Sequence, residues 1–214
     1  MRPVLLVMLG CLALGCTTSH SPVPAGVVVA AEPSESLDIQ PYPSKGPWIK
    51  VTDKTNATTA LTEWIPADQT TSDIHDILIR QAFFGMRETP AKFLRRMYAA
   101  AKDTCRGAIL NGPREETEGG YQVARGEIYC VGDTERNLDI DIFVKVIGGR
   151  DALYVVQREF REPAEPGAVA GKKLFDDGPD VKDRMLQFLN SRQEAVTFLA
   201  KGVSLHPLPD TSPR

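Results

Sequence analysis

The sequence lacks an apolar run long enough to cross a bilayer. Its longest such run extends from Val4 to Leu14, whereas a transmembrane helix needs about 20 apolar residues. It also lacks an excess of basic residues, because 25 Lys and Arg stand against 28 Asp and Glu, for a net charge of −3. Binding to nucleic acid depends on clustered basic side chains. This charge balance therefore argues against nucleic acid as a partner.

Residue types that usually carry catalysis or bind metal ions are scarce. The chain has four cysteines and three histidines, His20, His75 and His206. Neither set has the spacing of a metal site. A Gly-x-Ser-x-Gly nucleophile motif is absent from the sequence. We therefore expect no metal, no cofactor and no catalytic residue that a motif can identify.

The N-terminus is arranged as an export signal. Arg2 supplies one positive charge, the apolar run follows it, and small or polar residues come directly after. The stretch Ala13-Leu14-Gly15-Cys16 resembles the lipobox of bacterial lipoproteins, in which the final cysteine is lipidated. The resemblance implies that residues 1–15 are removed and that Cys16 carries acyl chains, which anchor the protein to a membrane on its periplasmic side. Thr17 is similar to the residue after the cysteine in lipoproteins sent on to the outer membrane.

Three alternatives to cleavage before Cys16 are open. Cleavage before Cys11 would leave an apolar segment of only about six residues for the export machinery. An ordinary secretory signal cut near Ala30 or Ala31 would give an exported protein without a lipid. A buried N-terminal segment of a cytosolic protein would give no export at all.

The two cysteines nearer the C-terminus fit the same arrangement. If Cys11 leaves with the signal and Cys16 takes the lipid, Cys105 and Cys130 remain as a pair. Exported proteins are exposed to an oxidising environment, so we predict a disulfide between these two residues. Closing a loop of about 26 residues stabilises a fold by roughly 3.5 kcal/mol in the chain-entropy model.

Composition divides the mature chain into a tether, one domain and a tail. Residues 16–47 are rich in Ser and Pro, which forbids a continuous helix and predicts a flexible tether behind the lipidated terminus. Residues 48–205 are expected to form a single domain, and residues 206–214 a tail. Within the domain, the segment 162–178 is rich in Pro and Gly and is expected to be a surface loop.

Hydrophobic periodicity predicts that the domain is α+β, in the order ββααββββα. The helices are expected at residues 72–84, 90–104 and 180–201. The strands are expected at residues 48–51, 61–65, 108–110, 121–131, 138–147 and 153–160. The last four strands follow one another through short links, which predicts an antiparallel sheet of four or more strands. We expect helices on one face of this sheet, in two layers.

Two carboxylates and one lysine alternate with apolar residues in the segment 138–147. Asp139, Asp141 and Lys145 share one face of this predicted strand, opposite the apolar face. A half-exposed strand needs such an arrangement, so we expect this face to be in contact with water. The alternative is that the two aspartates bind a hard cation or act as an acid and base pair.

A basic group, Lys92, Arg95 and Arg96, lies on the predicted helix 90–104. We expect it to be an ordinary solvated helix face, and contact with anionic lipid or an acidic partner is the alternative. We also expect His75 and His206 to be solvated surface residues, the alternative being a general base. The sequence as a whole favours a non-enzymatic cell-envelope module that binds a protein or cell-wall partner. The competing hypothesis is a lipid-tethered periplasmic enzyme with a site built from scattered carboxylates.

Overall fold

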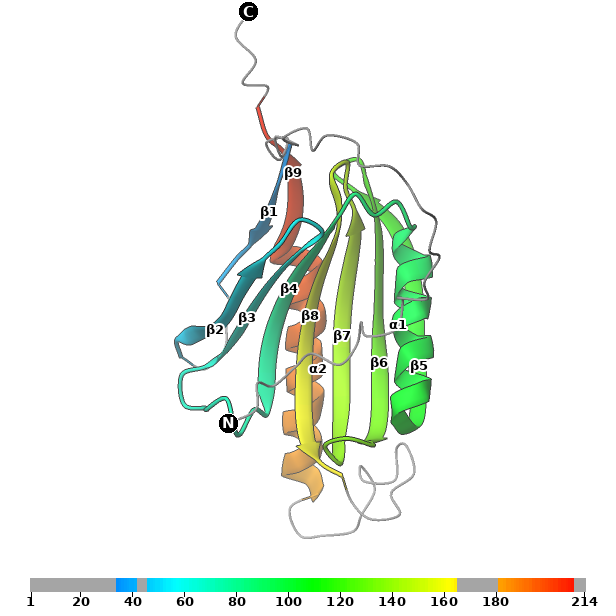
Figure 1. The fold of residues 1–214 in the computed structure, drawn as a ribbon. Helices are drawn as coiled ribbons and strands as arrows, with labels where there is room; N and C mark the ends of the chain where they lie inside the picture. Colours follow the sequence, from blue (N-terminus) through cyan, green and yellow to red (C-terminus); the bar gives the residue numbers. More distant parts are fainter. Residues whose placement is uncertain (1–33, 42–45, 165–180, 210–214) are drawn as a thin grey trace, which may run out of the picture. The chain divides into compact units, whose positions relative to one another are not determined.

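The computed structural model describes residues 34–41, 46–164 and 181–209. The predicted signal peptide, Cys16, most of the tether and most of the predicted loop 162–178 lie outside these residues. The described residues form nine strands and two helices, which make up an α+β fold (Figure 1). Neither of these two helices has the length and apolar character needed to cross a membrane.

Seven strands form one antiparallel sheet in the order β2-β3-β4-β8-β7-β6-β5. Their bounds are Trp48–Thr55 (β2), Thr59–Pro66 (β3), Asp76–Phe84 (β4), Cys105–Glu118 (β5), Tyr121–Asp133 (β6), Leu138–Gly148 (β7) and Ala152–Pro163 (β8). Strands β5 and β6 are joined by Gly119 and Gly120, which both have positive φ angles. Glycine adopts these angles without the steric cost that other residues meet, so the sequence can form a two-residue hairpin here.

A separate two-stranded ribbon is formed by β1 (Glu35–Ile39) and β9 (Val203–Pro207). Leu37 pairs with Leu205, and Ile39 pairs with Val203. All four of these apolar side chains pack against the core of the sheet. The ribbon therefore places the first described strand beside the last.

Helix α1 (Pro90–Thr104) begins where the sequence predicts. The side chain of Thr89 accepts a hydrogen bond from the backbone of Lys92, and Pro90 occupies the first turn, where its missing N–H costs nothing. Phe93 and Leu94 are buried against residues of the sheet, among them Val144. This packing fixes α1 on one face of β5, β6 and β7.

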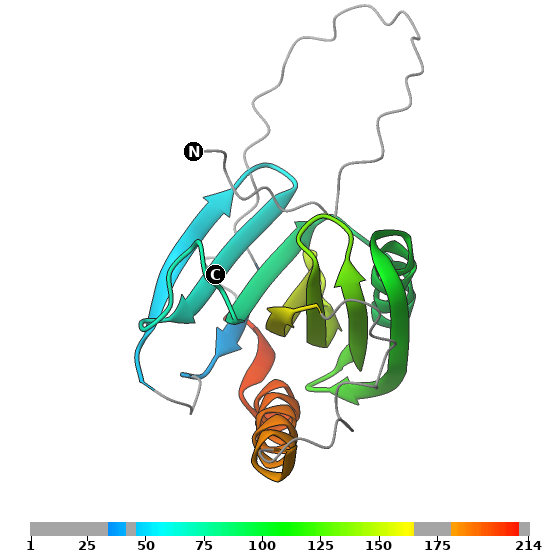
Figure 2. The ribbon, with the colours of Figure 1, turned by 90° about the horizontal axis from the view of Figure 1, so that it is seen from below.

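Helix α2 (Val181–Lys201) packs on the opposite face of the sheet. Phe198 and Leu199 contact the core cluster that includes Phe143 and Tyr154. Because neighbouring residues of a strand point to opposite faces, Val144 meets α1 while Phe143 meets the cluster of α2. Figure 2 shows the two helices on opposite sides of the sheet.

The predicted helix at 72–84 is wrong, because these residues contain strand β4. Three consecutive apolar residues, Ile77, Leu78 and Ile79, are all buried. A strand that lies between two others and is covered on both faces has no alternation of polar and apolar residues. Such a short apolar run does not distinguish a strand from a buried helix.

The predicted two-layer packing also needs correction, because helices cover both faces of the sheet. The face of β7 that was expected to be wet is therefore buried, with Asp139 and Asp141 each 5% exposed and Lys145 fully covered. The observed order is ββββαββββαβ. The helix at 90–104, the α+β class and the antiparallel pairing of the last four predicted strands are confirmed, although the strand predicted at 108–110 extends over Cys105–Glu118.

The domain boundaries also differ from those predicted. Strand β1 lies inside the segment 16–47 that was expected to be tether, and β9 continues to Pro207, beyond the expected end at 205. Each of these strands is short, and the only strand with which each pairs in the described residues is the other. Pairing between segments this far apart in the sequence leaves no signal in a local sequence window.

Candidate functional site

The face of the sheet beneath α2 and β9 carries an unusual number of charged side chains. They come from β5, β6 and β7, and they divide into two groups that lie around Lys145 and Arg192. Burying a charge away from water is costly unless a partner of opposite charge or a hydrogen bond compensates it. The contacts of each group therefore decide whether any charge is available for chemistry.

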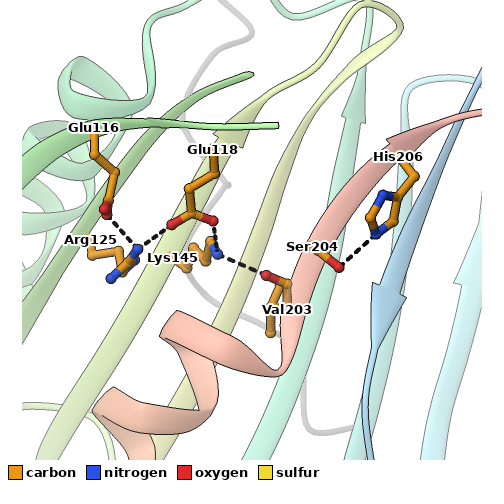
Figure 3. Close-up of polar contacts among 7 residues, drawn as sticks. All are labelled: Glu116, Glu118, Arg125, Lys145, Val203, Ser204 and His206. Carbon is orange, nitrogen blue, oxygen red and sulfur yellow. Dashed lines mark hydrogen bonds and ion pairs between the residues drawn. The ribbon is translucent and has the colours of Figure 1, made fainter. Parts of the chain in front are cut away.

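The Lys145 cluster consists of Glu116, Glu118, Arg125 and Lys145. The ammonium group of Lys145 is fully buried, and it donates hydrogen bonds to Glu118 and, over 2.8 Å, to the carbonyl oxygen of Val203 (Figure 3). Arg125 forms ion pairs with Glu118 and, at 2.6 Å, with Glu116. The cluster thus links β5, β6 and β7 to the start of β9.

The ionisation of the Lys145 cluster follows from its burial and its pairing. Burial alone would raise the pKa of Glu118, but hydrogen bonds from Lys145 and Arg125 outweigh it and lower this pKa. Burial lowers the pKa of Lys145, and Glu118 opposes that change. Glu118 is therefore held as a carboxylate that balances two cations. This arrangement stabilises the junction between the sheet and β9 and provides no free acid or base.

The Arg192 cluster consists of Glu127, Asp141 and Arg192. Arg192 extends from α2 and forms an ion pair with Glu127 of β6, and one of its terminal nitrogens lies 3.5 Å from Asp141 of β7. The guanidinium group also lies over the ring of Phe143, at 5.5 Å from the ring centre. Nearby on β7, Asp139 accepts a hydrogen bond of 2.8 Å from the backbone of Gly132.

Asp141 has the most altered acidity in this cluster. Burial, and secondly the negative charge of Glu162, raise its pKa to about 7. Tyr129 pairs with Asp141 across the sheet, and its pKa rises to about 12 because it is buried and because Asp139 and Asp141 are negatively charged neighbours. A carboxyl group with a pKa near 7 is suited to general acid and base catalysis. Since Asp141 is only 5% exposed, a substrate could reach it only if the covering residues moved.

A Ser, a His and an Asp also come together on the β1–β9 ribbon. The hydroxyl of Ser204 lies 2.9 Å from Nε2 of His206, and Asp38 lies 3.8 Å from the same nitrogen. In a catalytic triad the acid and the hydroxyl contact opposite nitrogens of the ring. Here both approach one nitrogen, so His206 cannot be oriented by Asp38 while it accepts a proton from Ser204. Figure 3 shows Ser204 and His206 near the Lys145 cluster but not joined to it.

The other charged residues singled out in the sequence have acidic neighbours. Arg96 and Lys92 both lie within ion-pair distance of Glu88, at 2.9 and 4.0 Å, and Arg95 lies 3.7 Å from Glu115. His75 lies 3.0 Å from Asp73. Among the residues that the structure describes, no group of three His, Cys, Asp or Glu side chains could hold a metal ion.

A groove of about 540 Å³ runs along the C-terminal half of α2 and is open to solvent. Four of its nine lining residues carry uncharged hydrogen-bonding side chains. The lining residues are Gln40, Pro41, Asn190, Gln193, Glu194, Thr197, Phe198, Lys201 and Gly202. Amide and hydroxyl groups can both donate and accept hydrogen bonds, so these four side chains could bond to the backbone of a peptide chain.

The outward face of α2 beside this groove is apolar at regular intervals. Leu186, Leu189 and Val196 are each about half exposed, and their spacings of three and seven residues place them on one side of the helix. An exposed apolar row beside a groove that also offers hydrogen-bonding side chains is typical of a surface that binds another protein. The outward face and the groove together form the binding surface proposed below, which we call the α2 surface.

The sequence provided only part of this description. It identified Asp139, Asp141 and Lys145 as sharing one face, but not that α2 covers this face or that Arg192 reaches it. It also did not show that Leu189 and Val196, on the helix expected at 180–201, are about half exposed. Helical spacing shows that Leu186, Leu189 and Val196 lie near one another on the helix, but it does not show whether that side is buried or exposed.

No protein-family model matches this sequence, and no curated protein is similar to it. Among solved structures, a point mutant of the protein Mog1 is 12% identical, over 77% of this chain and 88% of that chain, with a TM-score of 0.41. LpqN, described as involved in cell envelope biogenesis of Mycobacterium tuberculosis, is 15% identical, over 83% of this chain and 87% of that chain, with a TM-score of 0.34.

Proposed function

We propose that this chain is a bacterial lipoprotein, anchored through acylated Cys16 on the periplasmic side of a membrane, that acts as a non-enzymatic binding module of the cell envelope. The layout of residues 1–16 supports the anchor. The paired charges of the Lys145 cluster support a non-enzymatic role, because they stabilise the fold. Thr17 favours the outer membrane in a cell that has one.

The disulfide between Cys105 and Cys130 is the observation that carries the proposed export. Cys105 begins β5 directly after α1, Cys130 lies on the neighbouring strand β6, and their Cα atoms are 5.6 Å apart. Disulfides persist in oxidising compartments and are rare in the bacterial cytosol. With these two residues bonded to each other, Cys16 remains available to carry lipid.

Replacement of Cys16 tests the anchor. In Cys16→Ser we expect no incorporation of labelled fatty acid and no cleavage by the lipoprotein signal peptidase, because both reactions require the thiol. Cys11→Ser is the matched control and should leave labelling and cleavage unchanged. Normal processing of Cys16→Ser at the same position, with retention in the membrane fraction, would show that the anchor is assigned wrongly.

We propose that the partner binds the α2 surface and is a protein, since the apolar row suits a helix or an extended chain. A photo-crosslinking amino acid at Gln193, in the middle of this surface, is expected to give a discrete adduct with one envelope protein in intact cells. The same amino acid at Lys92, which is 76% exposed on α1, is the control and should not give this adduct. Adducts of equal yield from both positions, or an adduct with glycan alone, would contradict a protein partner at the α2 surface.

A further inference from the structure

The start of β1 and the end of β9 lie together at one end of the domain, which we call the tether end (Figure 1). The backbone and the hydroxyl of Ser34 donate hydrogen bonds to Asp151 over 2.6 and 2.7 Å, and the backbone of Leu208 donates to Ser34 over 2.8 Å. Gly85 donates to the carbonyl oxygen of Asp151 over 2.8 Å. The turns after β4 and β7 therefore meet at the point where residues 17–33 join the domain.

Apolar side chains are exposed at this end. Phe84, the last residue of β4, is 40% exposed, and Leu208, the first residue after β9, is 43% exposed. Both are connected through backbone contacts to Ser34 and Asp151, since Phe84 precedes Gly85 in the chain. Two exposed apolar residues do not by themselves define a contact surface, so the groups beside them and the place where the chain enters the domain matter as well.

At the tether end, acidic side chains bond to backbone groups of the turns, whereas basic residues are exposed. Glu35 is 4% exposed and accepts backbone hydrogen bonds from Arg150 and Asp151, and Asp151 is occupied by Ser34. Arg87 and Arg150 are exposed, and the guanidinium group of Arg87 donates one hydrogen bond to the carbonyl oxygen of Arg150. The carboxylates are thus directed into the turns, while the guanidinium groups lie on the outside, where they can meet phosphate groups.

We propose that the tether end lies on the surface of the bilayer that holds Cys16, with Phe84 and Leu208 in the headgroup region and with Arg87 and Arg150 against lipid phosphates. This inference rests on the proposed lipid anchor. Aromatic and aliphatic side chains beside arginines are the combination that binds an interface without crossing it. Because α2 leads into β9, which ends at the tether end, the N-terminal part of α2 would be directed away from the membrane.

The anchor alone does not impose this orientation. Residues 17–33 could span roughly 60 Å if fully extended, so a lipidated domain without a contact surface would rotate freely. A weak surface is sufficient once the lipid holds the domain nearby, because tethering raises its effective concentration at the bilayer. The geometry of the tether end supplies that surface at the place where the tether begins.

Hydrogen exchange of the lipidated full chain in vesicles of phosphatidylethanolamine and phosphatidylglycerol tests the proposal. Acylation of Cys16 is first checked by mass spectrometry. The reference in solution is Cys16→Ser produced without residues 1–15, which carries neither lipid nor signal segment. Relative to it, we expect exchange to slow by at least about threefold in residues 84–88 and 149–151. The turn at 134–137, between β6 and β7, should exchange at the same rate in both samples.

Two double variants separate docking from other effects. Phe84→Ser with Leu208→Ser should stay acylated but lose the slow exchange, whereas Leu186→Ser with Leu189→Ser, a matched change on α2, should keep it. Unchanged exchange at the tether end of the acylated protein would overturn the docking and leave the anchor standing. Protection at residues 186–197 instead would show contact between neighbouring copies and would also overturn it. An absence of acyl chains on Cys16 would overturn both proposals.

Discussion

At the scale of single residues, Asp141 lies beneath α2 with 5% of its surface exposed, and its pKa is raised to about 7. An unfolded aspartate has a pKa of about 4, so the folded protein holds this proton more tightly than the unfolded chain does. The resulting stabilisation is fully present below about pH 4 and is lost as the pH rises through about 7. Asp141 therefore makes the folded state less stable at neutral pH than at mildly acidic pH.

Replacing Asp141 with Asn is expected to remove this pH dependence. Between pH 5 and pH 8, the difference in unfolding free energy should shrink by up to about 3 kcal/mol relative to the original protein, at about 1.4 kcal/mol for each unit of pKa shift. Urea unfolding at several pH values measures this. Glu162→Gln should reduce the dependence in part, because the charge of Glu162 is the second cause of the shift. Equal slopes in the original protein and Asp141→Asn would contradict the assignment.

The role of a single residue could be predicted from the sequence where the chemistry of its side chain determines that role. Cys105 and Cys130 were paired by elimination and by the expected compartment, and the disulfide is confirmed. The environment of Asp139 and Asp141 was predicted wrongly, because alternation along a strand shows which residues share a face but not what covers that face. The residue that covers Asp141, Arg192, lies far along the chain from it.

At the scale of elements, the disulfide fastens the end of α1 and the start of β5 to β6. Changing both Cys105 and Cys130 to Ala is expected to lower the unfolding free energy by about 2 to 4 kcal/mol, because the unfolded chain regains the freedom that a closed loop removes. Denaturant unfolding measures the change, and the far-ultraviolet spectrum should stay the same because the apolar core remains. A loss below about 0.5 kcal/mol would contradict the predicted contribution of this loop closure.

The strands β7 and β8 are expected to have the slowest amide exchange in the chain. They are adjacent in the sheet, flanked by β6 and β4, and buried along most of their length, so their amides exchange only through large openings. Strand β2 is the comparison, since it lies at an edge and is mostly exposed or half-exposed. Native-state hydrogen exchange distinguishes the two, and rapid exchange throughout residues 138–160 would rule out this sheet order.

Elements were predictable where local chemistry determines them. Thr89 and Pro90 mark the start of α1, because capping depends on nearby residues alone. The strand predicted at 108–110 instead extends to Glu118, where Gly119 and Gly120 form the hairpin. Strand β4 was mistaken for a helix because its burial on two faces comes from partners distant in sequence. Strands β1 and β9 were missed for the same reason.

At the scale of the whole molecule, the sequence indicated one α+β domain but not its layers. The number of covered faces depends on which face of the sheet α2 packs against. The amphipathic pattern of a helix does not specify that face. The ribbon of β1 and β9 adds cover on the same face as α2. Together they turn a face that the sequence suggested was solvated into an interior lined with paired charges.

The β1–β9 ribbon also has a mechanical consequence for an anchored protein. A force applied through Ser34 in the direction of β1 pulls that strand from one end, while β9 is held at its opposite end, Val203, by its continuation into α2. The two strands are then loaded lengthwise, and all their paired residues share the load. A sideways force would instead separate the pairs one after another, starting with Glu35 and Pro207. The ribbon would thus act as a clamp whose strength depends on the direction in which the membrane and the domain are drawn apart.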